Sequence, residues 1–172
     1  MARLQRLALA LVLIPVGLLA GIHFMMLIGI IPALQHLPLY TYVVTWQTLD
    51  YFMRLHMPAF SAVMMVLYLL TLICCANRWR TWFFWALLGC FALNVSEIAF
   101  TVTHQLPINR VVQALDPAHL VDIERVQQLR EVSVHNFRVR EWLAISSFVC
   151  LTLVVVMSKL PTKTTPGTPI EK

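Results

Sequence analysis

Four long apolar stretches divide the chain, and most of its polar residues lie between them. The stretches run from Leu7 to about Leu34, from Pro58 to Ala76, from Trp82 to Thr103 and from Trp142 to about residue 158. A helix of about 20 apolar residues crosses the hydrocarbon core of a bilayer. The pattern therefore predicts an all-α fold, an integral membrane four-helix bundle made by residues 1–160.

Two longer segments connect these spans on one side of the membrane. The first, Gln35–Met57, is rich in Tyr and Trp, which predicts a segment at the membrane surface with a short interfacial helix. In the second, His104–Glu141, Asp116 can cap a helix that has Pro117 at its first position. No Gly or further Pro follows before the fourth span, so we predict one long helix from there into the membrane. Residues 161–172, rich in Thr and Pro, are predicted to form a disordered tail.

Composition and charge agree with a membrane protein. Of the 172 residues 59% are hydrophobic and 12% charged, with a mean hydropathy of +0.75, well beyond the balance of soluble domains. The net charge of +5 is scattered, which argues against nucleic acid as a partner. Basic residues concentrate near the termini and in the short middle turn, at Arg3, Arg6, Arg78, Arg80, Lys159, Lys163 and Lys172. The positive-inside rule then predicts that both termini are cytoplasmic and that the two longer connections are extracytoplasmic.

The first span raises three separate points. Its basic opening is also typical of a secretory signal peptide, but the apolar run is too long and no small-residue cleavage site closes it. Gly17 and Gly21 have the small-x-x-x-small spacing that lets helices approach closely in lipid, just after Pro15. His23, in the middle of the span, is either bonded to a neighbouring helix or functional.

The third span carries a polar stripe. Asn94, Glu97, Thr101 and His104 follow at steps of three, four and three residues, so an ideal helix places them on one face. A carboxyl at membrane depth is costly and by default faces the interior of a bundle, paired with another group. Glu97 is therefore either an ion-paired packing element or a carboxyl that handles protons or binds a ligand.

A second polar stripe precedes the fourth span, formed by Glu131, His135, Arg138 and Trp142 at helical spacing. Both stripes approach the outer surface, so we expect His104 and His135 to meet at the rim of one pocket. Arg140 is interpreted as an interfacial anchor.

Three further polar residues lie just before the second span. Asp50 is interpreted as part of a weak ion pair in a solvated loop. Arg54 and His56 are near the same outer surface as the two stripes, and are secondary candidates for substrate binding.

Imidazole and carboxylate groups are also ligands for zinc, iron or copper. The candidates are His23, Glu97, His104 and His135. No histidine pair at i, i+4 and no H-E-x-x-H motif specifies such a site, so a metal, a haem held by two histidines and the absence of any cofactor all stay open.

The ordered fragments of the chain resemble the DUF1772 group of four-span membrane proteins, which includes the fungal anthrone oxygenases. They are Ile31-Pro-Ala-Leu, Leu37-Pro, the Gln47 to Arg54 stretch, T-V-T-H-Q-L-P-I-N-R from Thr101 to Arg110, and H-N-F-R from His135 to Arg138. The resemblance covers Gly17 to about Val156. The recurring polar features of that group correspond to Pro107, Asn109, His135 and Arg138, while Glu131 stands where that group has a tryptophan.

The resemblance implies an enzyme that oxidises an electron-rich aromatic carbon with dioxygen and little or no cofactor. Such chemistry needs a base and donors that hold an oxyanion. The implied catalytic residues are His135 or Glu97 as base and Asn109 and Arg138 as donors, and substrate-binding candidates are Asn94, Thr101, His104, Arg54, His56 and Trp142. The alternative is a non-catalytic module that binds a lipid, a quinone or haem, or a helper subunit of a complex; assembly as a homo-oligomer is left open.

Overall fold

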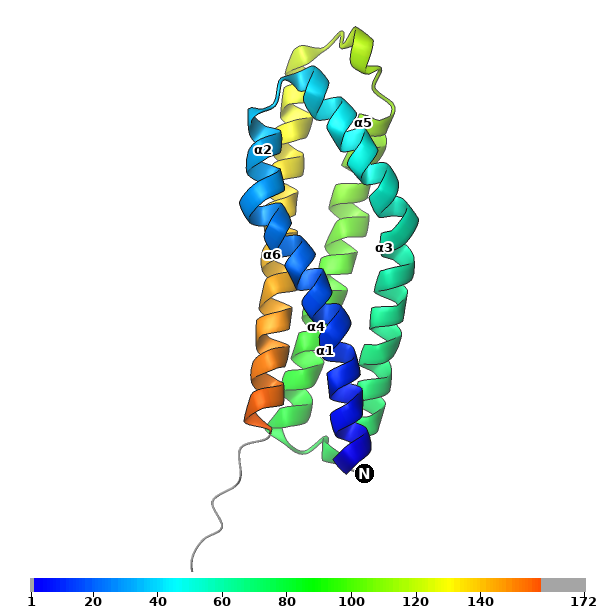
Figure 1. Ribbon diagram of the computed structural model, residues 1–172, viewed down its shortest axis with the longest axis vertical. Coiled ribbons are helices and arrows are strands. Elements are labelled where there is room, and N and C mark those ends of the chain that lie inside the picture. The colour runs from blue at the N-terminus through cyan, green and yellow to red at the C-terminus, as the bar shows by residue number, and fades with distance from the viewer. Residues whose placement is uncertain (1, 159–172) are drawn as a thin grey trace, which may run out of the picture.

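The computed structural model describes residues 2–158, which form four long helical columns side by side (Figure 1). The first column is α1 (Ala2–Met25), η1 (Met26–Ile30) and α2 (Ile31–His36); the second is α3 (Leu39–Cys75); the third is α4 (Trp82–Phe100), η3 (Thr101–Gln105) and α5 (Leu106–Gln113); the fourth is α6 (Ile123–Met157). The short turns η2 (Ala76–Arg78) and η4 (Pro117–His119) lie in two of the connections. All four columns are long and apolar enough to cross a membrane, which confirms the predicted all-α bundle. The predicted tail, residues 161–172, lies outside the described residues.

The columns pack chiefly through α6, which contacts both α1 and α4, and through the pair α1 and α3. α1 and α3 lie close together near the N-terminus and diverge toward the other end (Figure 1). We call the end with the N-terminus and η2 the basic end, and the opposite end the loop end. Two apolar cores result. One, near the basic end, contains Val12, Tyr68, Leu87 and Leu151. The other, near the loop end, contains Met26, Tyr42, Trp46, Val112 and Phe137.

The second column is much longer than predicted, since α3 begins at Leu39 and passes through Pro58 without a break. The predicted start of the second long helix at Pro58 is therefore wrong, and only two residues separate the first two columns. The physical reason is burial. Tyr42, Val43 and Trp46 pack into the loop-end core, and this stabilises helix where the sequence pattern alone favours an interfacial segment.

Two π-helical turns interrupt the first and third columns, each two residues before a proline. The N–H of Ile31 bonds to the carbonyl of Met26 ahead of Pro32, and the N–H of Leu106 bonds to that of Thr101 ahead of Pro107. Proline has no N–H and its ring crowds the carbonyl four residues earlier, so the preceding turn widens. The third column thus continues to Gln113, past the predicted end at Thr103.

The cap predicted at Asp116 is present, but it starts a short turn. Its side chain accepts a hydrogen bond of 3.0 Å from the Ala118 N–H at η4. The long helix begins later, at Ile123, where the Asp122 carboxylate accepts from the Arg125 N–H at 2.9 Å. The predicted start at Pro117 is therefore six residues too early. The prediction of one helix that continues into the fourth span is confirmed.

Candidate functional site

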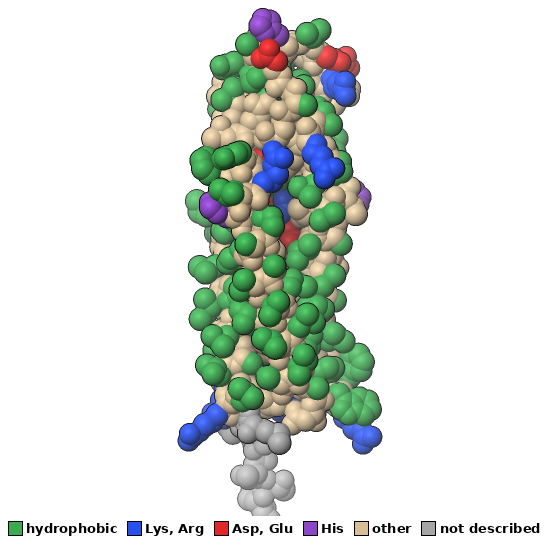
Figure 2. Space-filling view, turned by 90° about the vertical axis from the view of Figure 1, so that its right-hand side faces the viewer, with side chains coloured by type: hydrophobic (Ala, Val, Ile, Leu, Met, Phe, Trp, Pro, Cys, Tyr) green, Lys and Arg blue, Asp and Glu red, His purple; other side chains and the backbone are tan. Residues whose placement is uncertain are grey.

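A cavity of about 510 Å³ lies between the two apolar cores, lined by residues of all four columns. This volume is in the range of small-molecule sites. Most of its lining is apolar, and its polar wall consists of His23, Asp50, Arg54, Ser61, Glu97, Thr101, Asn109, Arg140 and Glu141. Figure 2 shows hydrophobic side chains over the lower part of one face, and above them basic side chains around a hollow in which acidic atoms are visible.

Glu97 is held by partners from two columns. Arg140 Nε donates to Glu97 Oε1 at 2.9 Å, and Thr101 Oγ1 donates to the same oxygen at 3.0 Å. His23 Nε2 lies 3.8 Å from it. Glu97 is 5% exposed, and the charge of Arg140 matches that of its carboxylate, which offsets the cost of burying it.

Glu141 has a different environment. It is fully buried, and neither carboxylate oxygen has a hydrogen-bond partner among the described residues. Oε1 faces His23 Nδ1 at 3.6 Å, and that nitrogen is also without a hydrogen bond in the same part of the chain. A buried carboxylate without donors is strongly unfavourable. Because Glu141 lines the cavity, it offers an acceptor, and with His23 a proton-accepting pair, to a bound molecule.

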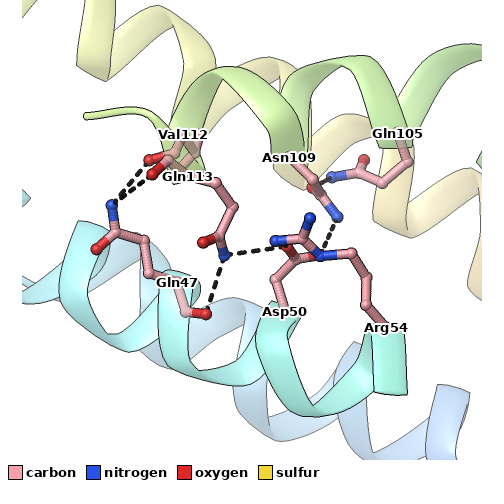
Figure 3. Close-up of polar contacts among 7 residues, drawn as sticks. All are labelled: Gln47, Asp50, Arg54, Gln105, Asn109, Val112 and Gln113. Carbon is pink, nitrogen blue, oxygen red and sulfur yellow. Dashed lines mark hydrogen bonds and ion pairs between the residues drawn. The ribbon is translucent and has the colours of Figure 1, made fainter. Parts of the chain in front are cut away.

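A second network fastens α3 to α5 at the loop end of the cavity (Figure 3). Asp50 Oδ1 accepts from Asn109 Nδ2 at 2.6 Å, and Oδ2 accepts from Arg54 Nη2 at 2.8 Å and from Gln113 Nε2 at 3.0 Å. Gln47 adds bonds to the last carbonyls of α5, at 3.0 Å to that of Val112. Asp50 is 3% exposed, so its interpretation as a solvated loop residue is wrong. The network positions Arg54 and Asn109 on the cavity wall.

Asn94 belongs to a third network, deeper in the bundle. Its Nδ2 donates to the Cys90 carbonyl at 3.0 Å, to Tyr68 Oη at 3.3 Å and to Ser147 Oγ. These bonds join α3, α4 and α6, and Asn94 does not line the cavity. Of the predicted substrate-binding residues on the third span, only Thr101 does.

The π-helical turn η3 moves His104 away from the interior. The widened turn adds one residue, so Gln105 follows Thr101 on the inner face, and its Nε2 donates to Asn109 Oδ1 at 2.7 Å and to Ser133 Oγ at 2.9 Å. His104 is exposed, stacks on Phe100 with ring centroids 4.5 Å apart, and contacts Thr103. An ideal helical spacing cannot foresee this shift.

The stripe on α6 lies on the outer side of the bundle. Glu131, His135, Arg138 and Trp142 are all exposed, and none lines the cavity. The expected meeting of His104 and His135 at the rim of a pocket is therefore wrong. Arg140 is no interfacial anchor, since its guanidinium points inward to Glu97. Periodicity shows which residues share a face, but in a membrane it does not show which face points inward.

Of the remaining residues predicted from the sequence, some line the cavity and others do not. Arg54 lies at the mouth of the cavity with its side chain 46% exposed, whereas His56 is exposed and does not line it. In residues 2–158 no group of three or more His, Cys, Asp or Glu side chains can hold a metal ion. Of the four proposed ligands, His23 and Glu97 come together; His104 and His135 do not join them.

Sequence reasoning missed three members of the site, Asp50, Arg140 and Glu141. A signal for Glu141 was present, because Ala144 and Ser147 continue its face at helical spacing, and small residues mark the side of a helix that approaches its neighbours. Both are buried.

Comparison with models of protein families, with curated proteins and with solved structures finds no match to this chain.

Proposed function

We propose that the chain is a membrane-embedded, oxygenase-like enzyme that oxidises a hydrophobic, aromatic substrate in the cavity. One observation carries the proposal: Glu141 is buried without a hydrogen-bond donor, opposite His23, on the wall of a mostly apolar cavity. A general base needs such an acceptor within reach of the substrate. The resemblance to the DUF1772 group supports the same chemistry, with the base now assigned to Glu141 in place of His135 or Glu97.

The proposed reaction is R₂CH₂ + O₂ → R₂C=O + H₂O. Glu141, assisted by His23, takes a proton from an activated CH₂ group, and the resulting carbanion gives its electrons to dioxygen. The peroxide that forms takes up the proton. Loss of water then breaks the O–O bond and the second C–H bond and leaves a carbonyl. The substrate supplies all four electrons, so the reaction balances without another reductant.

The negative charge that develops on the substrate oxygen requires donors. Arg140 lines the cavity, and its guanidinium has N–H groups beyond the Nε that bonds Glu97. Arg54 lies at the mouth. Asn109 donates its amide to Asp50, so we assign it to positioning and give the donor role to Arg140.

The location of the cavity fits a substrate that partitions into lipid. Glu141 lies 16 residues before Met157, or about 24 Å along the helix from the basic end. With a hydrocarbon core of about 30 Å starting there, the cavity is in the far leaflet. The positive-inside rule makes the basic end cytoplasmic, so we propose that the cavity is near the extracytoplasmic surface.

Oxygen uptake by the purified protein in lipid nanodiscs, with an anthrone-type substrate, tests the proposal. Glu141→Gln should lower the rate about 100-fold or more, the range of general-base catalysis. His135→Ala is the control, because His135 is exposed outside the cavity and should have little effect. Uptake that survives Glu141→Gln at the wild-type rate would remove the proposed base.

The mostly apolar lining favours a second candidate, a non-catalytic module that binds a lipid or quinone. Such a module binds the anthrone-type compound or a quinone without consuming oxygen. Binding measured alongside uptake, on the same nanodiscs, separates the two.

A further inference from the structure

A second hollow adjoins the cavity between α1, η1 and α3. Its volume is about 450 Å³, and every side chain that lines it is apolar. It shares four lining residues with the cavity, Ile22, Met26, Trp46 and Met53. These four side chains border both spaces. We call the second hollow the apolar groove.

The apolar groove follows the first column from Gly17 to Ile30, about 20 Å along the helix axis. Gly21, near its middle, leaves it open, since a Cβ placed there meets nothing within 4 Å. Gly17 and Gly21 lie on the basic-end side of His23, and hence deeper in the hydrocarbon. The groove thus runs from the level of the cavity toward the middle of the bilayer, where an apolar chain is soluble.

Two carboxylates of the cavity are paired with arginines, Asp50 with Arg54 and Glu97 with Arg140, while Glu141 faces His23. A neutral head therefore fits this wall better than an ion does. The two unbonded oxygens of Glu141 require a donor. A phospholipid phosphate is negatively charged and has no proton to donate, so it would be repelled by this carboxylate.

We propose that the molecule bound in the cavity is a tailed phenol or quinol. Its hydroxyl-bearing ring lies in the cavity and donates to Glu141, and its alkyl or prenyl tail lies in the apolar groove. The inference rests on the proposed function, because it assumes that the cavity is the ligand site. It adds to the proposed substrate a hydroxyl group on its ring and a tail, and it gives the place of the tail.

Two probes with the same head test this arrangement, a hydroquinone with a decyl chain and one with a methyl group. Binding to protein-loaded nanodiscs is measured and corrected with empty nanodiscs of the same lipid. Gly21→Phe fills the groove from an open position and should weaken binding of the decyl probe about tenfold while leaving the methyl probe unchanged. Gly89→Phe is the matched control, because a Cβ there also meets nothing within 4 Å and Gly89 lines neither space.

The outcomes separate the two proposals. If the methyl probe responds to Glu141→Gln, but Gly21→Phe weakens both probes equally or neither, the tail assignment is overturned and the cavity remains the site. If neither probe binds the wild-type protein, or if Glu141→Gln leaves the binding of both unchanged, the hydroxyl-bearing head is overturned. Oxygen uptake with the anthrone-type substrate then decides the proposed function separately.

Discussion

His23 on α1 places its Nδ1 3.6 Å from Oε1 of Glu141 on α6, and neither atom has a hydrogen-bond partner within residues 2–158. A few ångströms away, Glu97 on α4 is satisfied by Arg140 and Thr101. The bundle therefore holds two buried carboxylates on the cavity wall, one with hydrogen-bond donors and one without any among residues 2–158. Glu97 is part of the packing of the bundle, and Glu141 is the carboxylate suited to accept a proton.

The two carboxylates should respond differently to neutralisation. Glu97→Gln leaves Arg140 without its partner and should lower the free energy of unfolding by about 3 kcal/mol, as for other broken buried pairs. Glu141→Gln removes a charge that has no donor and should leave stability unchanged or raise it. Thermal unfolding of both variants in the same detergent makes the comparison. Equal losses would mean that Glu141 is as well bonded as Glu97.

The register shift at η3 predicts contrasting effects at two neighbouring positions. Gln105→Ala removes donors to Asn109 and Ser133 inside the bundle and should cost about 2 kcal/mol. His104→Ala, at an exposed site, should change stability by no more than about 0.5 kcal/mol. Denaturant or thermal unfolding measures both. A larger loss at His104 would place the histidine inside and contradict the π-helical turn.

The loop end has a pH dependence of its own at Asp116. The hydrogen bond from the His119 side chain, and then that from the Ala118 N–H, holds the pKa of the Asp116 carboxyl below its usual value of 3.8. A lowered pKa in the folded state means that the η4 turn is fully stabilised above pH 3.8. This stabilisation is lost as the pH falls through the lower, folded-state value.

The amide resonance of Ala118 reports this titration. The transition of this resonance that comes from Asp116 should have its midpoint below the ordinary aspartate value of 3.8. Asp116→Asn removes the titrating group and serves as the control. A midpoint at or above 3.8 in the wild-type protein would show that the two hydrogen bonds do not form in solution.

The two glycines of the first span should behave oppositely. A Cβ on Gly17 would lie 3.1 Å from Cε2 of Phe148 on α6, so Gly17→Ala forces that ring to move and should destabilise the bundle by about 1 kcal/mol. Gly21→Ala meets open space and should stabilise the helix by a similar amount, through helix propensity. Unfolding measurements on the pair test the contact. Stabilisation by both variants would mean that α1 and α6 are farther apart at Gly17 than the structure has them.

The presence of four long apolar helices was readable from the chain, because in a membrane solvation acts on each segment separately. Long apolar runs such as Trp82–Thr103 must be helical in lipid to satisfy their own backbone, whatever their neighbours do. Glu97 was recognised for a similar reason, since a carboxyl in such a run requires a partner. The prolines at 32 and 107 were visible too, and they mark the two widened turns.

The sequence by itself thus determined that the chain is a bundle of four apolar helices with a costly carboxyl inside. Only the tertiary structure decided which groups surround that carboxyl. Packing against α5 and α6 turned the segment from Leu39 to Asp50 into buried helix, and the π-helical turn exchanged His104 for Gln105. On α6 the same rotation about the helix axis that exposes His135 buries Glu141. The physical reason is that lipid and bundle interior are both apolar, so hydrophobicity does not orient a helix, and only contacts between distant segments do.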